Sequence, residues 1–255
     1  GSGVVIVHGS MQDASSQTDL AALLAERHAV HLVDRRGHGD SGAHPGPPYT
    51  EREADDLRAV LEATGARSVF GVSSGAIVAA RAALAGAPLE RLALFEPPLV
   101  FDGSADLGAL PAFDAAIERG ELPTAMGVAM KIAQMGPPWM FGLPVPVLAA
   151  ASRRLLRSPV TAERARALVA DFGVVRENAD RVDEFAGVAV RTLVVSGSAT
   201  RPYLKGAAAA IAERIPGSRH VVLAGEWHGV TQNRAERGRP DRVAPALLDF
   251  FAAAG

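Results

Sequence analysis

The feature that most constrains the fold of this chain is a five-residue turn, Gly71-Val72-Ser73-Ser74-Gly75, between two segments of different character. The apolar run Ser68 to Phe70 before it indicates a buried strand, and the alanine-rich run Ala76 to Ala85 after it indicates a helix. Small residues on both sides of Ser73 let strand and helix approach closely, so the turn between them can be sharp. The pattern therefore predicts a serine hydroxyl presented at the carboxyl end of a strand, where it can act as a nucleophile.

The same alternation of apolar strand and helix extends along most of the chain. Short β-branched or apolar runs occur at residues 4–7, 29–34, 68–70, 92–95, 192–195 and 221–223. Because helical composition separates them, we predict an α/β fold with a mostly parallel central sheet and helices on both faces.

The alternation stops between about Phe101 and Val188. Here the sequence offers helical pieces, without a convincing strand, at residues 112–119, 122–134, 147–156, 162–171 and 178–185. We therefore predict an α/β core from residues 1–100 and 189–255, and a helical cap inserted over the sheet from residues 101–188.

A histidine near the end of the chain is the best placed general base. His228 follows the last predicted strand, and a base must lie there to meet Ser73 at the carboxyl edge of the sheet. His220 begins that strand and so belongs at the opposite edge. We expect His8 and the remaining histidines to be structural or to belong to turns.

Four segments together resemble the landmarks of the α/β-hydrolase superfamily, in the same chain order: residues 4–9, 34–42, 71–75 and 225–229. In that superfamily a His-Gly pair ends the strand before the oxyanion loop, and an Asp-x-Arg-Gly-x-Gly-x-Ser turn follows the next strand. The resemblance implies Ser73 as nucleophile and His228 as base, with the backbone N–H groups of Ser10 and Ser74 as the oxyanion hole. We expect the strands with which the family's sheet usually begins, before Val4, to be missing.

The acid of the triad does not stand where most of the family has it. The stretch after the strand at 192–195, residues 196–205, contains no Asp or Glu, and the next acid, Glu213, falls deep in a predicted helix. Glu96 ends the strand after the nucleophile helix and is followed by two stiffening prolines. An acid at that strand end is a known variant in some lactone-hydrolysing members. We predict Glu96 as the acid; the alternatives are a dyad without an acid, or another loop acid such as Asp102, with Glu96 pairing with the cap helices.

The predicted activity is acyl transfer to water. A Ser–His–Glu triad would cleave an ester or lactone through an acyl-enzyme intermediate, and the mostly apolar insertion favours a small, hydrophobic, uncharged substrate. Trp139, Met140, Phe141 and Trp227 are candidates for the substrate pocket, although the first three would serve equally well as the core of the insertion. The same triad could instead hydrolyse a C–C or thioester bond or carry out cofactor-free perhydrolysis, and a catalytically silent binding protein is the remaining alternative.

Composition excludes several other classes. The net charge is −2 and the arginines are scattered among acids, so nothing indicates nucleic-acid binding. No cysteine is present, which removes disulfides and thiolate sites and suits the cytoplasm. The apolar runs are too short and proline-rich to span a membrane, and no His/Asp/Glu cluster has metal-ligand spacing.

A G-x-G-x-x-G match at residues 37–42 lacks the following helix that a dinucleotide site needs. We expect a monomer or homodimer that acts on a small molecule without a cofactor.

Overall fold

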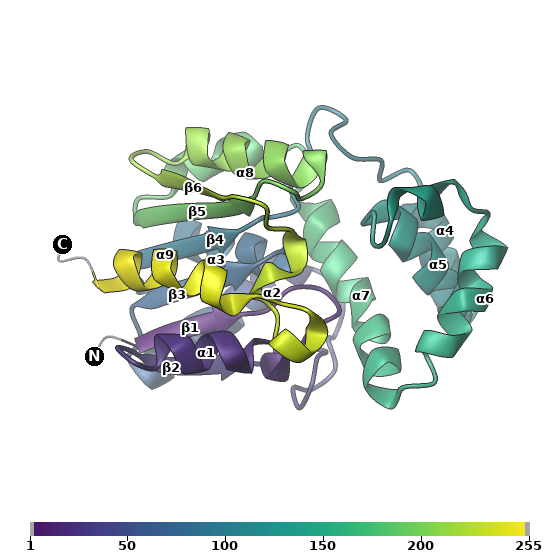
Figure 1. Cartoon of the computed structure of the whole chain (residues 1–255), viewed down its shortest axis with the longest axis horizontal. Helices are drawn as coiled ribbons and strands as arrows, with labels where there is room; N and C mark the ends of the chain where they lie inside the picture. The colour runs from purple at the N-terminus through teal and green to yellow at the C-terminus, as the bar shows by residue number, and fades with distance from the viewer. Residues whose placement is uncertain (1–2, 253–255) are drawn as a thin grey trace.

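The computed structural model describes residues 3–252 and is built around one sheet of six parallel strands (Figure 1). The strands are β1 (Gly3–Val7), β2 (Ala29–Val33), β3 (Ser68–Val72), β4 (Arg91–Phe95), β5 (Arg191–Gly197) and β6 (Arg219–Leu223). They lie in the order β2-β1-β3-β4-β5-β6, and every neighbouring pair is parallel. All six predicted strands are present, which confirms the predicted parallel sheet.

The four inner strands, β1, β3, β4 and β5, are almost completely buried because both faces of the sheet are covered there. Successive side chains of a strand point to opposite faces, so Val5 and Val7 of β1 enter one apolar cluster and Val4 and Ile6 enter the other. The first cluster lies under α2 (Tyr49–Thr64), α3 (Ser74–Leu84) and α8 (Pro202–Arg214). The second lies under α1 (Thr18–Leu24) and α9 (Pro240–Ala252).

The predicted insertion forms a compact group of helices beyond the carboxyl ends of the strands (Figure 1). These are α4 (Leu110–Glu118), α5 (Leu122–Ile132), α6 (Val145–Leu155) and α7 (Pro159–Glu177). They surround an apolar cluster of their own that includes Phe113, Leu168 and Phe172. Five short 3-10 helices complete the described elements: η1 (Ala14–Gln17), η2 (Pro138–Gly142), η3 (Val182–Gly187), η4 (His228–Thr231) and η5 (Arg234–Glu236).

Helix α7 belongs to both parts of the molecule. Its middle packs into the cluster of the cap through Leu168, whereas Val174 joins the core cluster beneath α3. The change from the apolar cluster of the cap to that of the core therefore falls within α7. The pieces predicted at 162–171 and 178–185 also differ from the structure: the first is part of one longer helix, and the second is a turn followed by η3, whose Phe185 is packed as core.

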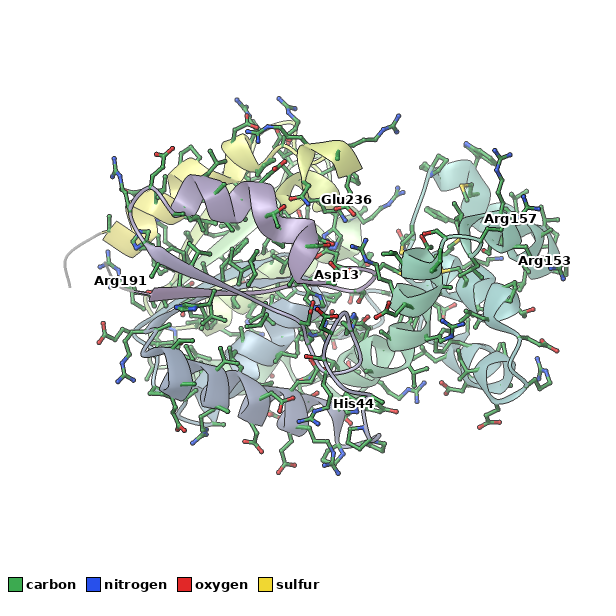
Figure 2. All side chains as sticks on the ribbon, turned by 90° about the horizontal axis from the view of Figure 1, so that it is seen from below. Asp13, His44, Arg153, Arg157, Arg191 and Glu236 are labelled. Atoms are coloured by element: carbon green, nitrogen blue, oxygen red, sulfur yellow. The ribbon has the colours of Figure 1, made fainter. Side chains whose placement is uncertain are left out.

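An ion pair network ties the cap to the core near the carboxyl edge of the sheet. Arg164 of α7 lies 2.8 Å from Asp13 and 3.1 Å from Glu236. Both acids lie on the side of the core that faces the cap (Figure 2). Among residues 3–252, no helix combines the length and apolar character needed to cross a membrane.

Candidate active site

The turn between β3 and α3 places Ser73 in a strained backbone conformation. Its φ of 53° and ψ of −124° are unusual for a residue with a side chain. Glycine is needed on either side: a Cβ on Gly71 would lie 2.6 Å from the Cα of Ala76, and one on Gly75 would lie 2.3 Å from the carbonyl oxygen of His8. The N–H of Ser73 donates to the carbonyl of Phe95 at 2.8 Å. The strain is thus held by close packing against β1 and β4.

The structure brings Ser73, His228 and Glu96 into one hydrogen-bonded row. His228 Nε2 lies 3.1 Å from Ser73 Oγ, and His228 Nδ1 lies 2.5 Å from Glu96 Oε2. Since a carboxylate can only accept, Nδ1 carries the proton in this arrangement and Nε2 is free to accept one from the serine. The row therefore has the geometry of a nucleophile, a general base and an orienting acid.

Glu96 is fully buried and is held from three sides. Gly197 N–H donates to Oε1 at 2.7 Å and Thr200 Oγ1 donates to Oε2 at 2.9 Å, in addition to the bond from His228. The two donors other than His228 come from the last residue of β5 and from the segment that follows it, where the family usually carries its acid. That segment therefore positions the carboxylate that β4 supplies. The alternative acid, Asp102, is exposed, and its N–H pairs with Asp180 at 3.1 Å.

The two predicted oxyanion donors lie next to each other. Ser10 follows β1 and Ser74 begins α3, and their hydroxyl oxygens are 3.1 Å apart. The first N–H groups of a helix have no partner within the helix. In the part of the chain that the structure describes, the N–H groups of Ser10, Met11 and Ser74 have no protein acceptor. Met11, whose φ is 58°, adds a third free donor that the sequence did not single out.

A buried charge cluster that the sequence did not reveal lies beneath the turn. Arg35 bonds to Glu53 of α2 at 2.6 and 3.0 Å, to Asp171 of α7 at 2.7 Å and to Ser74 Oγ at 2.8 Å. Ser74 Oγ also donates to Asp171 at 3.0 Å. Burial acts to lower the pKa of Arg35, but the two carboxylates raise it well above its usual value. The one sequence signal is Asp171 itself, a charge within the apolar run 167–175.

His8 lies in this same buried region as a neutral group. Its Nε2 accepts the N–H of Arg35 at 3.1 Å, and its Nδ1 lies 2.9 Å from the carbonyl of Gly9. Burial, followed by the charge of Arg35, lowers the pKa of His8 to about 3. The position agrees with the structural role expected of it.

Two cavities share Ser73 and His228 in their walls, and we call the smaller one the inner chamber and the larger one the outer chamber. The inner chamber, about 110 Å³, has mostly apolar walls that include Pro98, Val100, Leu107, Ile132, Phe172 and Val175. The outer chamber, about 620 Å³, is wider and more polar, with walls that include Gln12, Gln134, Arg201, Trp227 and Gln232. An open depression of about 760 Å³ elsewhere, between α2, α3 and the end of α7, contains none of the three residues of the row.

Of the predicted pocket residues, only Trp227 lines a chamber. Trp139 is 69% exposed, and residues 139–141 line neither chamber among the described cavities. They lie in η2, which begins at Pro138, and the preceding residues 133–137 form the wall instead. Met140 packs against the cap cluster and Phe141 lies 4.9 Å from the guanidinium of Arg201.

Tyr203 is a wall residue that sequence reasoning missed. It lines the inner chamber, and its hydroxyl donates to the carbonyl of Ala133 at 3.4 Å. Burial, with a smaller effect of Glu96, raises the pKa of Tyr203 to about 12. Its phenol is therefore a neutral donor at neutral pH. Within residues 3–252, no three His, Asp or Glu side chains are grouped so that they could hold a metal ion.

Comparison with known proteins places this geometry in context. Residues 4–246 match the Alpha/beta hydrolase family. An alpha/beta hydrolase from Sphaerobacter thermophilus DSM 20745 is 34% identical over 99% of this chain and 94% of that chain, with a TM-score of 0.80. The enol-lactonase from Burkholderia xenovorans LB400 is 24% identical over 99% of this chain and 92% of that chain, with a TM-score of 0.72. A thermophilic esterase from Thermogutta terrifontis is 24% identical over 98% of this chain and 89% of that chain, with a TM-score of 0.73. No curated protein matched the sequence.

Proposed function

The chain belongs to the alpha/beta hydrolase family, and from that premise we propose that it is a serine hydrolase acting on an ester or lactone bond of a small, largely apolar substrate. The observation that carries the proposal is the unbroken row Ser73–His228–Glu96, with separations of 3.1 and 2.5 Å. The family includes hydrolases of many substrates, so the reaction is argued from the site.

Each residue of the row has a defined part in the proposed reaction. His228 Nε2 takes the hydroxyl proton as Ser73 Oγ attacks the carbonyl carbon, and the buried Glu96 carboxylate stabilises the imidazolium that results. Backbone N–H groups of Ser10 and Ser74 bind the oxyanion. His228 then gives the proton to the departing alkoxide, and a water molecule repeats the sequence to release the acid and restore Ser73.

The two chambers suggest how a substrate would divide between them. The acyl group stays bonded to Ser73 while the alcohol leaves, so the alcohol needs the wider route. We place the acyl group in the inner chamber, whose volume of about 110 Å³ is much smaller than the about 620 Å³ of the outer chamber. We place the alcohol in the outer chamber. Short acyl chains should therefore be preferred. The names of two structures with the same fold, an enol-lactonase and an esterase, make esters and lactones the first compounds to test.

Covalent labelling tests the proposal most directly. A fluorophosphonate probe should modify the purified protein at Ser73, as located by peptide mass spectrometry, and Ser73→Ala should abolish the labelling. The neighbouring variant Ser74→Ala should still be labelled, because it keeps the backbone N–H of the proposed oxyanion hole and loses only a hydroxyl that faces Asp171 and Arg35. Absence of labelling at Ser73 in the wild-type protein would contradict a serine hydrolase.

A substrate panel separates the reactions that the same row could perform. Short-chain p-nitrophenyl esters, lactones, thioesters and a C–C bond substrate should be compared at equal concentration. We expect ester or lactone hydrolysis to have the highest kcat/KM, with acetate to butyrate preferred over octanoate. A labelled Ser73 together with faster thioester or C–C cleavage would replace the proposed substrate class while retaining the nucleophile.

A further inference from the structure

The outer chamber contains an arginine without an acidic partner. Arg201 stands at the N-terminus of α8 and is half-buried in the chamber wall. Its Nε donates to the carbonyl of Gln134 at 3.2 Å, its Nη2 donates to the carbonyl of Gly136, and its Cζ lies 4.9 Å from the centre of the Phe141 ring. Among residues 3–252, no carboxylate forms an ion pair with it.

Two other arginines that are shielded from water are each paired with two acids. Arg35 meets Glu53 and Asp171 at 2.6 and 2.7 Å, and Arg164 meets Asp13 and Glu236 at 2.8 and 3.1 Å. Arg201 differs because its known partners are neutral carbonyl groups. A guanidinium carries five N–H donors. The N–H groups on Nη1 of Arg201 have no acceptor among the described residues.

The surroundings of Arg201 leave its charge uncompensated. Among the described residues that line the two chambers, none is Asp or Glu, and the other polar side chains of the outer chamber are mainly Gln12, Gln134 and Gln232. The nearby carboxylate of Glu96 is fully buried and already accepts from Gly197, Thr200 and His228. A fixed positive charge in a partly enclosed cavity attracts anions more strongly than one in open solvent.

We propose that Arg201 binds a carboxylate on the alcohol half of the substrate, so that the substrate is a short-chain acyl ester of a hydroxy acid, or a lactone that carries a carboxylate. This inference rests on the proposed hydrolase function. It replaces the uncharged substrate that the apolar composition of the insertion predicted. The acyl half remains uncharged, because the inner chamber offers no charged group apart from the catalytic row.

Arg201 also holds the loop 134–136 of the cap, and the experiment has to separate that structural role from recognition. The probes are acetate esters of ω-hydroxy acids with two to six carbons, each paired with the ester of the matching ω-hydroxy amide. The amide has nearly the same shape and no charge. The ratio of kcat/KM within a pair isolates the effect of the carboxylate, whereas a disturbed loop changes both members.

At the best chain length, the wild-type protein should favour the carboxylate by about ten- to a hundredfold, the range that a charge-assisted hydrogen bond supplies. The preference should reside mainly in KM. In Arg201→Gln the ratio should fall to near one, and Arg201→Lys should retain part of it. Arg153→Gln is the matched control, since Arg153 lies exposed at the outer edge of the cap (Figure 2) and should leave the ratio unchanged.

Two results would overturn the inference. One is a ratio near one in the wild-type protein at every chain length, and the other is a ratio that Arg201→Gln leaves intact. Calorimetric binding of the same pairs to Ser73→Ala gives a readout that does not need turnover, with the carboxylate expected to bind at least tenfold more tightly.

If Ser73 reacts with the fluorophosphonate and neutral esters are hydrolysed without a carboxylate preference, only this inference fails. If Ser73 is not labelled, the proposed function fails, and the binding comparison still decides the role of Arg201.

Discussion

Two adjacent serines in the turn between β3 and α3 each connect to a buried carboxylate, and the two carboxylates differ in what surrounds them. Ser73 reaches Glu96 through His228, and Ser74 Oγ bonds directly to Asp171 at 3.0 Å. Asp171 faces a permanent cation, Arg35, at 2.7 Å. Glu96 receives hydrogen bonds from a backbone N–H, a hydroxyl and an imidazole, none of which carries a permanent charge.

The difference in charge balance separates a carboxylate that can stabilise a new cation from one that cannot. The attraction of Asp171 is already used by Arg35, so the pair fixes the turn in place. Glu96 keeps an uncompensated negative charge next to an imidazole that becomes cationic only during the proposed reaction. Burial alone, which is nearly equal for the two groups, would not distinguish them.

Removing the Glu96 carboxylate should have the largest effect on activity. In Glu96→Ala we expect kcat for a p-nitrophenyl ester to fall by about 10⁴-fold, which is the loss seen when a triad carboxylate is neutralised. A fall of about tenfold is the smallest that agrees with the assigned role. The urea midpoint should show a protein that is still folded. Near wild-type turnover in this variant would remove Glu96 from the triad.

Removing the charge of Asp171 should affect stability more than catalysis. Asp171→Asn breaks a buried ion pair and leaves Arg35 with one carboxylate, which should lower the free energy of unfolding by about 3–5 kcal/mol, measured by urea denaturation. The control is Asp249→Asn, whose partner Arg219 lies 3.0 Å away in an exposed pair, where a change of about 0–1 kcal/mol is expected. Equal effects of the two variants would contradict the structural role of the buried cluster.

The dependence of stability on pH should come from His8, which lies in the same buried region as Arg35 and Asp171. The folded protein holds the pKa of His8 at about 3, well below the unfolded value of about 6.5. Between these values the unfolded chain binds the proton and the folded protein does not, so stability falls as the pH is lowered, by at most about 1.4 kcal/mol per pH unit from this group.

A variant at His8 tests this assignment. His8→Gln should flatten the slope of unfolding free energy against pH between pH 6 and pH 4. His31→Gln, at a half-buried strand position, is the comparison. An unchanged slope in His8→Gln would assign the acid sensitivity to other groups.

The smallest expected effect is at Thr200, which contributes one of the three hydrogen bonds to Glu96. Thr200→Val should reduce kcat by about two- to tenfold, the value of a single hydrogen bond, without a change in the urea midpoint. Thr200→Ser should restore most of the rate, because the hydroxyl is retained. A Thr200→Ser variant as slow as Thr200→Val would show that packing and not the hydroxyl matters.

The sequence was sufficient for features that depend on local pattern or on strand order. The six strands follow from short apolar runs. Ser73, His228 and Glu96 each follow a predicted strand, so parallel pairing brings them to one edge. The pairing of Arg35 with Asp171, 136 residues apart, depends on how the cap docks, which no local pattern encodes. The orientation of Trp139 was beyond prediction for the same reason, because apolar residues suit a chamber wall and a loop surface equally well.

The continuity of α7 determines how this protein can be rebuilt. One helix of 19 residues begins in the cap and ends in the core, and it carries Asp171 to a position beneath the turn between β3 and α3. An exchange of caps between related enzymes would keep the turn intact only if the new segment ended before Asp171. A graft joined at the end of the helix would discard the residue that holds Arg35 and Ser74, so substrate range and turn stability can be engineered separately only upstream of that point.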